Sequence, residues 1–175
     1  RVLHVTSTAF RAGVFLLAAV GCTTIRDRFR PHKEYETLIV TGNFVDSRLL
    51  AELIQNAKRH PILLLPTGEE RVMFLLGERG AAVEVAAEDL EWLVDYISPK
   101  TIIFLGDDSF APKRYRDRLK DKHAVTTYET GDWETIARSV GALLRIKNLD
   151  KDYRELRATL DRRGRVKPEK DFEVL

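Results

Sequence analysis

Polar residues that could contact a ligand gather at two short loops. Asn43 and Asp46 follow one apolar run, and Asp107 and Ser109 follow another. Adjacent carboxylates can hold a hydrated cation or transfer protons, and backbone amides at the start of a helix can bind an anion. The simpler interpretation, which we adopt, makes Asp46 a helix cap and makes Asp107 and Asp108 turn and helix-cap residues. Both loops stay candidate ligand-binding segments.

Residue types that often carry catalysis show no matching arrangement in the sequence. The four histidines lack metal-ligand spacing, and the single cysteine, Cys22, has no neighbour that would activate it. No glycine-rich phosphate-binding motif occurs. Glu129 and Asp132 would suit acid–base chemistry only if they converged on the loop at Asp107. The sequence therefore predicts no metal, no cofactor and, on balance, no catalytic residue.

The densest group of cations lies between residues 113 and 122, where six basic side chains accompany two aspartates. Such a run is usually a solvated helix face. It could also bind an acidic polymer, because lysine and arginine recognise phosphate and carboxylate groups with an affinity that falls as salt rises. The candidate polymer contacts are Arg114, Arg116, Arg118 and Lys120. A second basic cluster follows at residues 162–167.

An alternation of apolar strands and helices positions these loops. The expected strands cover residues 37–41, 61–65, 101–105 and 124–128, and the expected helices cover residues 47–58, 88–97, 111–122 and 130–145. Continuous apolar strands are typical of a parallel sheet that helices cover on both faces. We therefore predict an open, mainly parallel, Rossmann-like α/β sheet in three layers. Both candidate loops would lie at its carboxyl edge, where ligands of such folds usually bind.

Other segments are harder to assign. A strand at residues 2–6 and a helix at residues 12–20 would open the domain. We predict a helix over residues 69–76 followed by a short strand, although two strands at residues 72–76 and 81–86 about a turn would fit the same sequence. The predicted domain covers residues 1–147, and residues 148–175 form a charged tail that is partly helical.

Composition limits the class of protein. The chain has 175 residues, of which 44% are hydrophobic and 32% charged, so it can bury a core of its own. Its net charge of +2 gives no indication of specific nucleic-acid binding. The apolar run from Ala12 to Gly21 has the length of a buried helix, so we predict no transmembrane segment.

Four short motifs occur in a distinctive order. They are Asn43-Phe44-Val45-Asp46-Ser47-Arg48-Leu49, Pro61-Ile62-Leu63-Leu64, Leu105-Gly106-Asp107 and Asp132-Trp133-Glu134-Thr135-Ile136. This order resembles the type 2 cell-wall-binding repeat of Gram-positive and some archaeal surface proteins. The resemblance covers residues 2–145. Val45 stands where the family has proline, Asp107 where it has a second glycine, Asp132 where it has arginine, and Trp133 where it has tyrosine. Residues 67–87 are also longer than the usual spacing there.

The resemblance implies a non-enzymatic binding or scaffolding domain in the cell envelope or outside the cell. Its partner would be an anionic cell-wall polysaccharide or another protein chain, and related repeats associate in threes, so a homo-oligomer is one possibility. The motif positions expected to pack behind the binding surface are Phe44, Pro61, Ile62, Leu63, Leu64, Trp133, Glu134 and Thr135.

Two alternatives remain open at this point. A small-molecule-binding α/β enzyme or regulatory domain would use the two loops at Asp46 and Asp107, and would be compatible with the cytoplasm. A structural subunit of a larger assembly would instead dock its charged tail on another chain.

Overall fold

Six strands form a single mixed sheet. They are β1 (Thr37–Gly42), β2 (Ile62–Leu65), β3 (Arg71–Leu75), β4 (Val83–Ala86), β5 (Thr101–Leu105) and β6 (Val125–Tyr128). Their order in space is β4-β3-β2-β1-β5-β6. The strands β2, β1, β5 and β6 pair in parallel in that order, and Ile39 of β1 lies opposite both Ile62 and Ile103. The computed structural model describes residues 35–66, 71–75 and 82–165.

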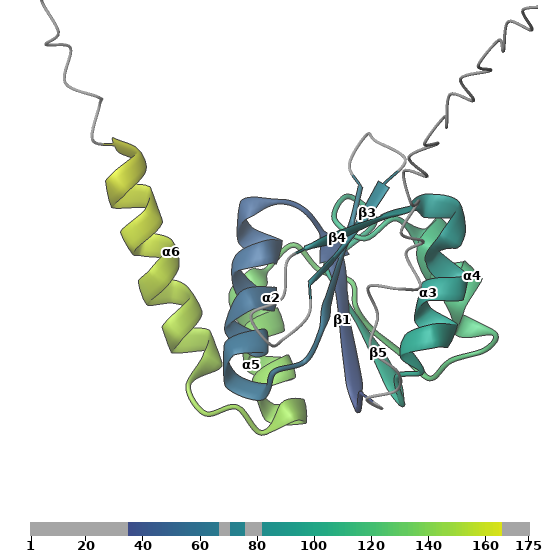
Figure 1. Cartoon of the computed structure of the whole chain (residues 1–175). Coiled ribbons are helices and arrows are strands. Elements are labelled where there is room, and N and C mark those ends of the chain that lie inside the picture. Colours follow the sequence, from purple (N-terminus) through teal and green to yellow (C-terminus); the bar gives the residue numbers. More distant parts are fainter. Residues whose placement is uncertain (1–34, 67–70, 76–81, 166–175) are drawn as a thin grey trace, which may run out of the picture. The chain divides into compact units, whose positions relative to one another are not determined.

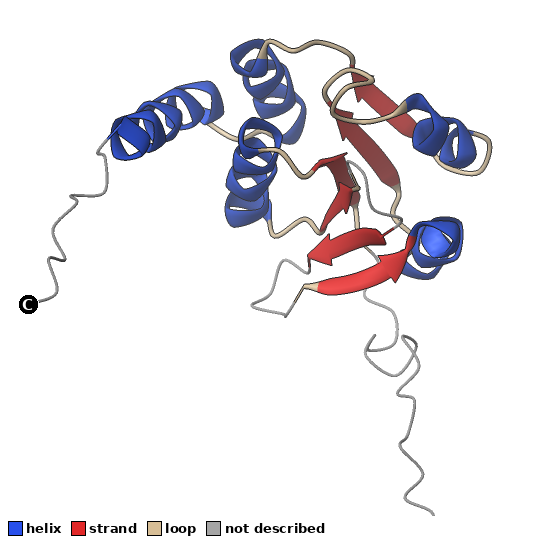
Figure 2. Cartoon of the chain, turned by 90° about the horizontal axis from the view of Figure 1, so that it is seen from above, coloured by secondary structure: helices blue, strands red, loops and turns tan. Residues whose placement is uncertain are grey.

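Helices cover both faces of this sheet. They are α2 (Val45–Lys58), α3 (Leu90–Ile97), α4 (Lys113–Lys120), α5 (Trp133–Leu144) and α6 (Leu149–Arg165), and a short 3-10 turn (Ala87–Asp89) precedes α3. Figure 1 shows α2 and α5 on one face and α3 and α4 on the other, and Figure 2 shows the strands between the two groups from above. The predicted three-layer, Rossmann-like α/β fold is thereby confirmed.

The core explains why the central strands are continuous apolar runs. Every residue of β1 and of β2 is buried, because helices exclude water from both faces of these strands. On one face, Ile39 and Ile62 pack with Leu50 and Ile54 of α2 and with Ile136 of α5. Each such side chain contributes about 1.5–3 kcal/mol when fully removed from water.

The prediction of a helix over residues 69–76 is wrong. Residues Arg71–Leu75 form β3, which pairs antiparallel with β2 and with β4. Val72 and Phe74 are buried and Arg71 is exposed, so the segment follows the alternation of a strand. A short apolar run has no reliable period of its own, and the open edge of β2 supplies the hydrogen-bond partners that decide its structure. The alternative of two strands is what the fold contains.

Helix α6 packs against the outer side of α2 and α5 (Figure 1). Leu149 and Tyr153 are only 2% and 4% exposed and belong to the same core cluster as β1. A Cβ on Gly141 of α5 would lie 3.2 Å from the Leu149 Cβ, so a small residue there lets the two helices approach closely. The predicted strand at residues 2–6 and helix at residues 12–20 lie outside the described residues.

Candidate functional site

The carboxyl ends of β1 and β5 form the point where the sheet changes direction. From β1 the chain crosses through α2 to β2 on one side, whereas β5 continues through α4 to β6 on the other. The loops that leave such neighbouring strands diverge, and ligands of open α/β folds bind in the crevice between them. Asn43 follows β1 and Asp107 follows β5, so the two predicted loops do lie on neighbouring strands.

Three aromatic rings occupy this crevice. The ring centroids of Phe44 and Phe110 are 5.1 Å apart with an interplanar angle of 75°. Those of Phe110 and Trp133 are 4.8 Å apart at 85°. Both are edge-to-face contacts, which aromatic pairs favour. Trp133 is 8% exposed and Phe44 is 38% exposed, so the cluster is buried at α5 and reaches the surface at α2. We call these three side chains the aromatic plug.

Two glycines make room for the aromatic plug. A Cβ on Gly42 would overlap the Phe110 carbonyl oxygen and lie 2.9 Å from the Phe44 ring. A Cβ on Gly106 would lie 2.6 Å from the Phe110 Cβ, and Gly106 also has φ of +97°, which favours glycine. The glycines at the ends of β1 and β5 therefore serve the packing of aromatic side chains, which the sequence did not reveal.

The prediction that Asp46 caps α2 is wrong, because Ser47 performs that role. The Ser47 hydroxyl donates to the Gly42 carbonyl at 2.6 Å, and its oxygen accepts from the Phe44 N–H at 3.4 Å. Helix α2 begins at Val45, so Asp46 already lies in its first turn, where its charge still suits the helix dipole.

Asp46 is instead bound by α6. The Tyr153 hydroxyl donates to Asp46 Oδ1 at 3.2 Å, and the Arg157 guanidinium forms an ion pair with the same carboxylate. Burial raises the pKa of Tyr153 above its usual value, and the charge of Asp46 raises this pKa further. Sequence reasoning missed both partners, although Leu149, Tyr153 and Arg157 share one face of the helix at a spacing of four residues.

The loop at Asp107 is a turn, as predicted, but the helix-cap role predicted for its carboxylates is wrong, because Pro112 is the N-cap of α4 and no side chain caps that helix. Asp107 Oδ1 accepts from the Ser109 N–H at 2.9 Å, and the Asp107 carbonyl accepts from the Ala111 N–H at 2.8 Å. Ser109 is exposed and its backbone closes this turn. The exposed side chain of Asn43 lies on the neighbouring loop. Hydrogen bonding within the turn accounts for the position of Asp107 without any ligand.

Arg116 joins two carboxylates across the same edge. Its Nη1 lies 2.6 Å from Glu129 Oε1, and its Nη2 lies 3.0 Å from Asp108 Oδ1. The Arg116 side chain is 11% exposed, whereas both carboxylates are well exposed. Glu129 therefore converges on the loop through an arginine bridge.

Asp132 caps α5. Its carboxylate accepts from the Thr135 N–H at 3.2 Å and from the Thr135 hydroxyl at 2.5 Å. The hydrogen bonds from Thr135 lower the pKa of Asp132. The adjacent Glu134 binds Arg154 of α6 at 2.9 Å. In the motif around Trp133, Trp133 thus belongs to the aromatic plug, Asp132 caps α5, and Glu134 contacts α6.

Most of the basic run on α4 is internally neutralised. Arg118 lies 2.9 Å from Glu91 and also donates to the carbonyls of Ala87 and Glu88, at 3.1 and 3.2 Å. Lys120 lies 2.9 Å from Asp117. Hydrogen bonds from Arg118 and then Lys122 lower the pKa of Glu91. Together with Arg116, four of the six cations between residues 113 and 122 have a carboxylate partner.

Lys113 and Arg114 are the exceptions in this run. Both are exposed, and neither has a carboxylate partner among the described residues. The Arg114 guanidinium lies over the Tyr115 ring, 4.9 Å from its centroid, and donates to the Tyr115 hydroxyl at 3.2 Å. Of the four predicted polymer contacts, only Arg114 presents a cation that no carboxylate neutralises.

The packing positions predicted from the second motif are all internal. Pro61, Ile62, Leu63 and Leu64 are buried in and beside β2. Thr135 is exposed and engaged with Asp132. The four buried residues are out of reach of a ligand, and only Thr135 contacts solvent.

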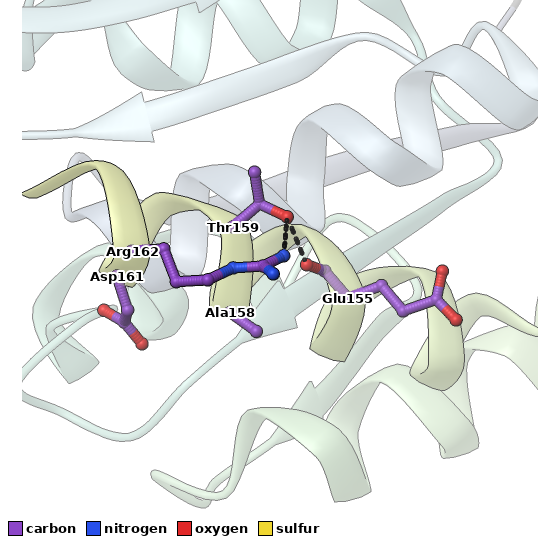
Figure 3. Close-up of a pocket in the computed structure, with 5 residues that line it drawn as sticks. All are labelled: Glu155, Ala158, Thr159, Asp161 and Arg162. Carbon is purple, nitrogen blue, oxygen red and sulfur yellow. Dashed lines mark hydrogen bonds between the residues drawn. The ribbon is translucent and has the colours of Figure 1, made fainter.

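A hollow of about 640 Å³ lies against α6 (Figure 3). Its lining consists of Glu155, Ala158, Thr159, Asp161 and Arg162. Figure 3 shows Arg162 directed at the Thr159 hydroxyl, to which it donates at 3.2 Å, and that hydroxyl donates to the Glu155 carbonyl at 2.9 Å. All lining residues come from one helix, so the hollow is open surface with satisfied polar groups.

Comparison with known proteins adds no relative. No family model matches the chain, and neither curated proteins nor solved structures yield a match. Within residues 35–66, 71–75 and 82–165, no three metal-ligating side chains gather to hold an ion. None of the described helices has both the length and the apolar character needed to cross a membrane.

Proposed function

We propose that this chain is a non-catalytic binding or scaffolding domain of the cell envelope that recognises an anionic cell-wall polysaccharide. The observation that carries the proposal is the aromatic plug. Phe44, Phe110 and Trp133 occupy the crevice where an α/β enzyme of this topology would admit a substrate. A ligand of this domain is therefore bound on an outer surface.

The chemistry of the ligand follows from the motif order and from the basic side chains. The partial match to the cell-wall-binding repeat supports a wall polymer as partner. Cations on an outer surface suit a repeating anionic chain, since several weak contacts add along the polymer. Another protein chain, including further copies of this one, is the second class of partner that the resemblance supports.

The alternative of a small-molecule enzyme requires an open crevice between the two loops. A substrate at the loops of Asn43 and Asp107 would have to displace the aromatic plug, which Gly42 and Gly106 are shaped to accommodate. Such displacement would expose buried aromatic surface at a considerable cost. The binding function requires no such movement.

The test is binding of the whole chain to an isolated anionic wall polymer, for which poly(glycerol phosphate) serves as the probe. We expect binding at low salt that weakens as salt rises, and no binding to neutral dextran. Duplex DNA controls for charge alone. Absence of binding to poly(glycerol phosphate) at low salt, or a clear preference for DNA, would overturn the proposal.

A further inference from the structure

Two helices on one face of the sheet end at arginines with a left-handed backbone. Arg59 ends α2 with φ of 58°, and Arg145 ends α5 with φ of 53°, while on the other face the uncharged Ser98 ends α3 with φ of 49°. The residue at such a helix end is usually glycine, because a Cβ strains the left-handed conformation. Strained backbone persists where the surrounding structure imposes it, and it often marks a functional position.

These two arginines lie at the same edge of the sheet. Helices α2 and α5 each follow a parallel strand and run back antiparallel to it, so both end at the amino edge. The two helices cover the same face and pack against each other, and both end at the lower edge in Figure 1. Lys58 precedes Arg59, and Lys147 follows Arg145 by two residues.

All four cations are available to a partner. Lys58, Arg59, Arg145 and Lys147 are exposed, and none of them forms an ion pair with another described residue. We call these residues the amino-edge basic surface. On α4, by contrast, most cations already have carboxylate partners.

Three carboxylates lie near this surface, and two of them have a partner. Glu36 lies 3.7 Å from Lys100. Asp150 lies 3.8 Å from Arg138, which offsets its charge, and Asp152 is the exposed carboxylate on the first turn of α6. A hollow of about 350 Å³ lies between the end of α5 and the start of α6, and its lining includes Arg138, Arg145 and Lys147. The local balance is positive around a surface that is partly concave.

His60 lies beside Lys58, between a cation and a carboxylate that act on its pKa in opposite directions. Burial lowers the pKa of His60 below its ordinary value, and the charge of Lys58 lowers it further. The carboxylate of Glu36 opposes this shift, so burial remains its main cause.

We propose that the amino-edge basic surface is where the anionic polysaccharide binds, and that Arg59 and Arg145 keep a strained backbone because their side chains contact its acidic groups. The inference rests on the proposed function and gives it a location. Its structural competitor is a favourable interaction of each arginine with the helix dipole. That competitor explains a cation near each helix end but requires no ligand.

The decisive variant is Arg59→Gly with Arg145→Gly. Glycine relieves the left-handed strain, so we expect a higher Tm together with weaker binding to poly(glycerol phosphate). Each cation close to an anionic surface contributes roughly 5-fold in affinity, so the pair should cost roughly 25-fold. The charge-retaining variant Arg59→Lys with Arg145→Lys should bind nearly as well as the wild type.

A second pair of variants removes charge without changing backbone strain. Lys58→Gln with Lys147→Gln should weaken binding and leave Tm nearly unchanged, whereas Lys113→Gln with Arg114→Gln on α4 should leave binding unchanged. If the wild type binds and only the α4 variant loses affinity, the location is overturned and the proposed function stands. A lower Tm in the glycine variant would overturn the functional explanation of the strain. If the wild type does not bind at all, the proposed function itself fails.

Discussion

The two edges of the sheet differ in how many of their charged side chains have a partner. At the carboxyl edge, Asp46, Asp108 and Asp132 are occupied by an ion pair, an arginine bridge and a helix cap. At the amino edge, Arg59 and Arg145 are exposed without a carboxylate partner among the described residues. The crevice that the topology marks for ligands is filled by the aromatic plug. At that edge Lys113 and Arg114 at the start of α4 also lack a carboxylate partner among the described residues, whereas the amino edge presents four such cations.

The density of charged residues in a sequence therefore does not measure how many charges are available for binding. Residues 113–122 form the densest basic run, yet Arg116 and Arg118 are held by carboxylates from other elements. The amino-edge basic surface draws two residues from each of two separate helix ends and forms no dense run. A charge that folding has already neutralised gains little from a new partner, since the existing pair must first be broken.

The largest effect should come from filling the space beside the aromatic plug. We expect Gly42→Ala and Gly106→Ala each to lower the free energy of unfolding by about 3 kcal/mol, because a Cβ would overlap Phe110. Gly131→Ala is the matched control at the same edge, where the Cβ would meet only Asp107 Oδ2 at 3.9 Å. Urea unfolding measures all three. A loss of less than about 1 kcal/mol in the first two variants would mean that the carboxyl edge is loosely packed.

An intermediate effect on the free energy of unfolding is expected when a paired cation on α4 is replaced, and a smaller one when an unpaired cation is replaced. Arg116→Met leaves Asp108 and Glu129 without their shared partner, so we expect unfolding to become easier by about 2 kcal/mol. Lys113→Met on the same helix, where no carboxylate partner is described, should change stability by no more than about 0.5 kcal/mol. Equal effects in urea unfolding would remove the distinction between the two kinds of cation.

The smallest effect concerns titration at the amino edge. The folded-state pKa of His60 lies below the unfolded value of 6.5, so protonation favours the unfolded chain. Stability contributed by neutral His60 is therefore present above that value and declines as pH falls through it. We expect Lys58→Gln to raise the His60 pKa part of the way toward 6.5, because burial remains the larger cause. NMR titration of the imidazole measures this, and an unchanged pKa would argue against a positive field there.

Much of the fold was predictable because its signals are local. The apolar runs of β1, β2 and β5, and the helical spacing of Leu50 and Ile54, match the structure closely. The strand β3 was not predicted, because its apolar residues fit either period until β2 provides hydrogen-bond partners. Local periodicity defines an element only where burial on one face or on both leaves a clear pattern.

The position of the candidate site could be predicted from the sequence, but the contacts that its residues make could not. Asn43 and Asp107 do follow neighbouring parallel strands, which the alternation of elements implies. Ser47 as the helix cap was missed because α2 begins two residues earlier than its apolar spacing indicates. The closing of the crevice was also missed, since Phe44, Phe110 and Trp133 lie on three different segments of the chain.

By itself, the sequence determined a mainly parallel α/β sheet with its polar loops at one edge, because strand burial and helix amphipathicity follow from the pattern of neighbouring residues. Only the tertiary structure decided which charges are free. Arg118 finds Glu91 at a separation of 27 residues, and Tyr153 finds Asp46 at a separation of 107. Pairing over such distances depends on how the elements pack, and no local pattern records it. The left-handed arginines at the amino edge became visible for the same reason, since a backbone angle is set by the fold around it.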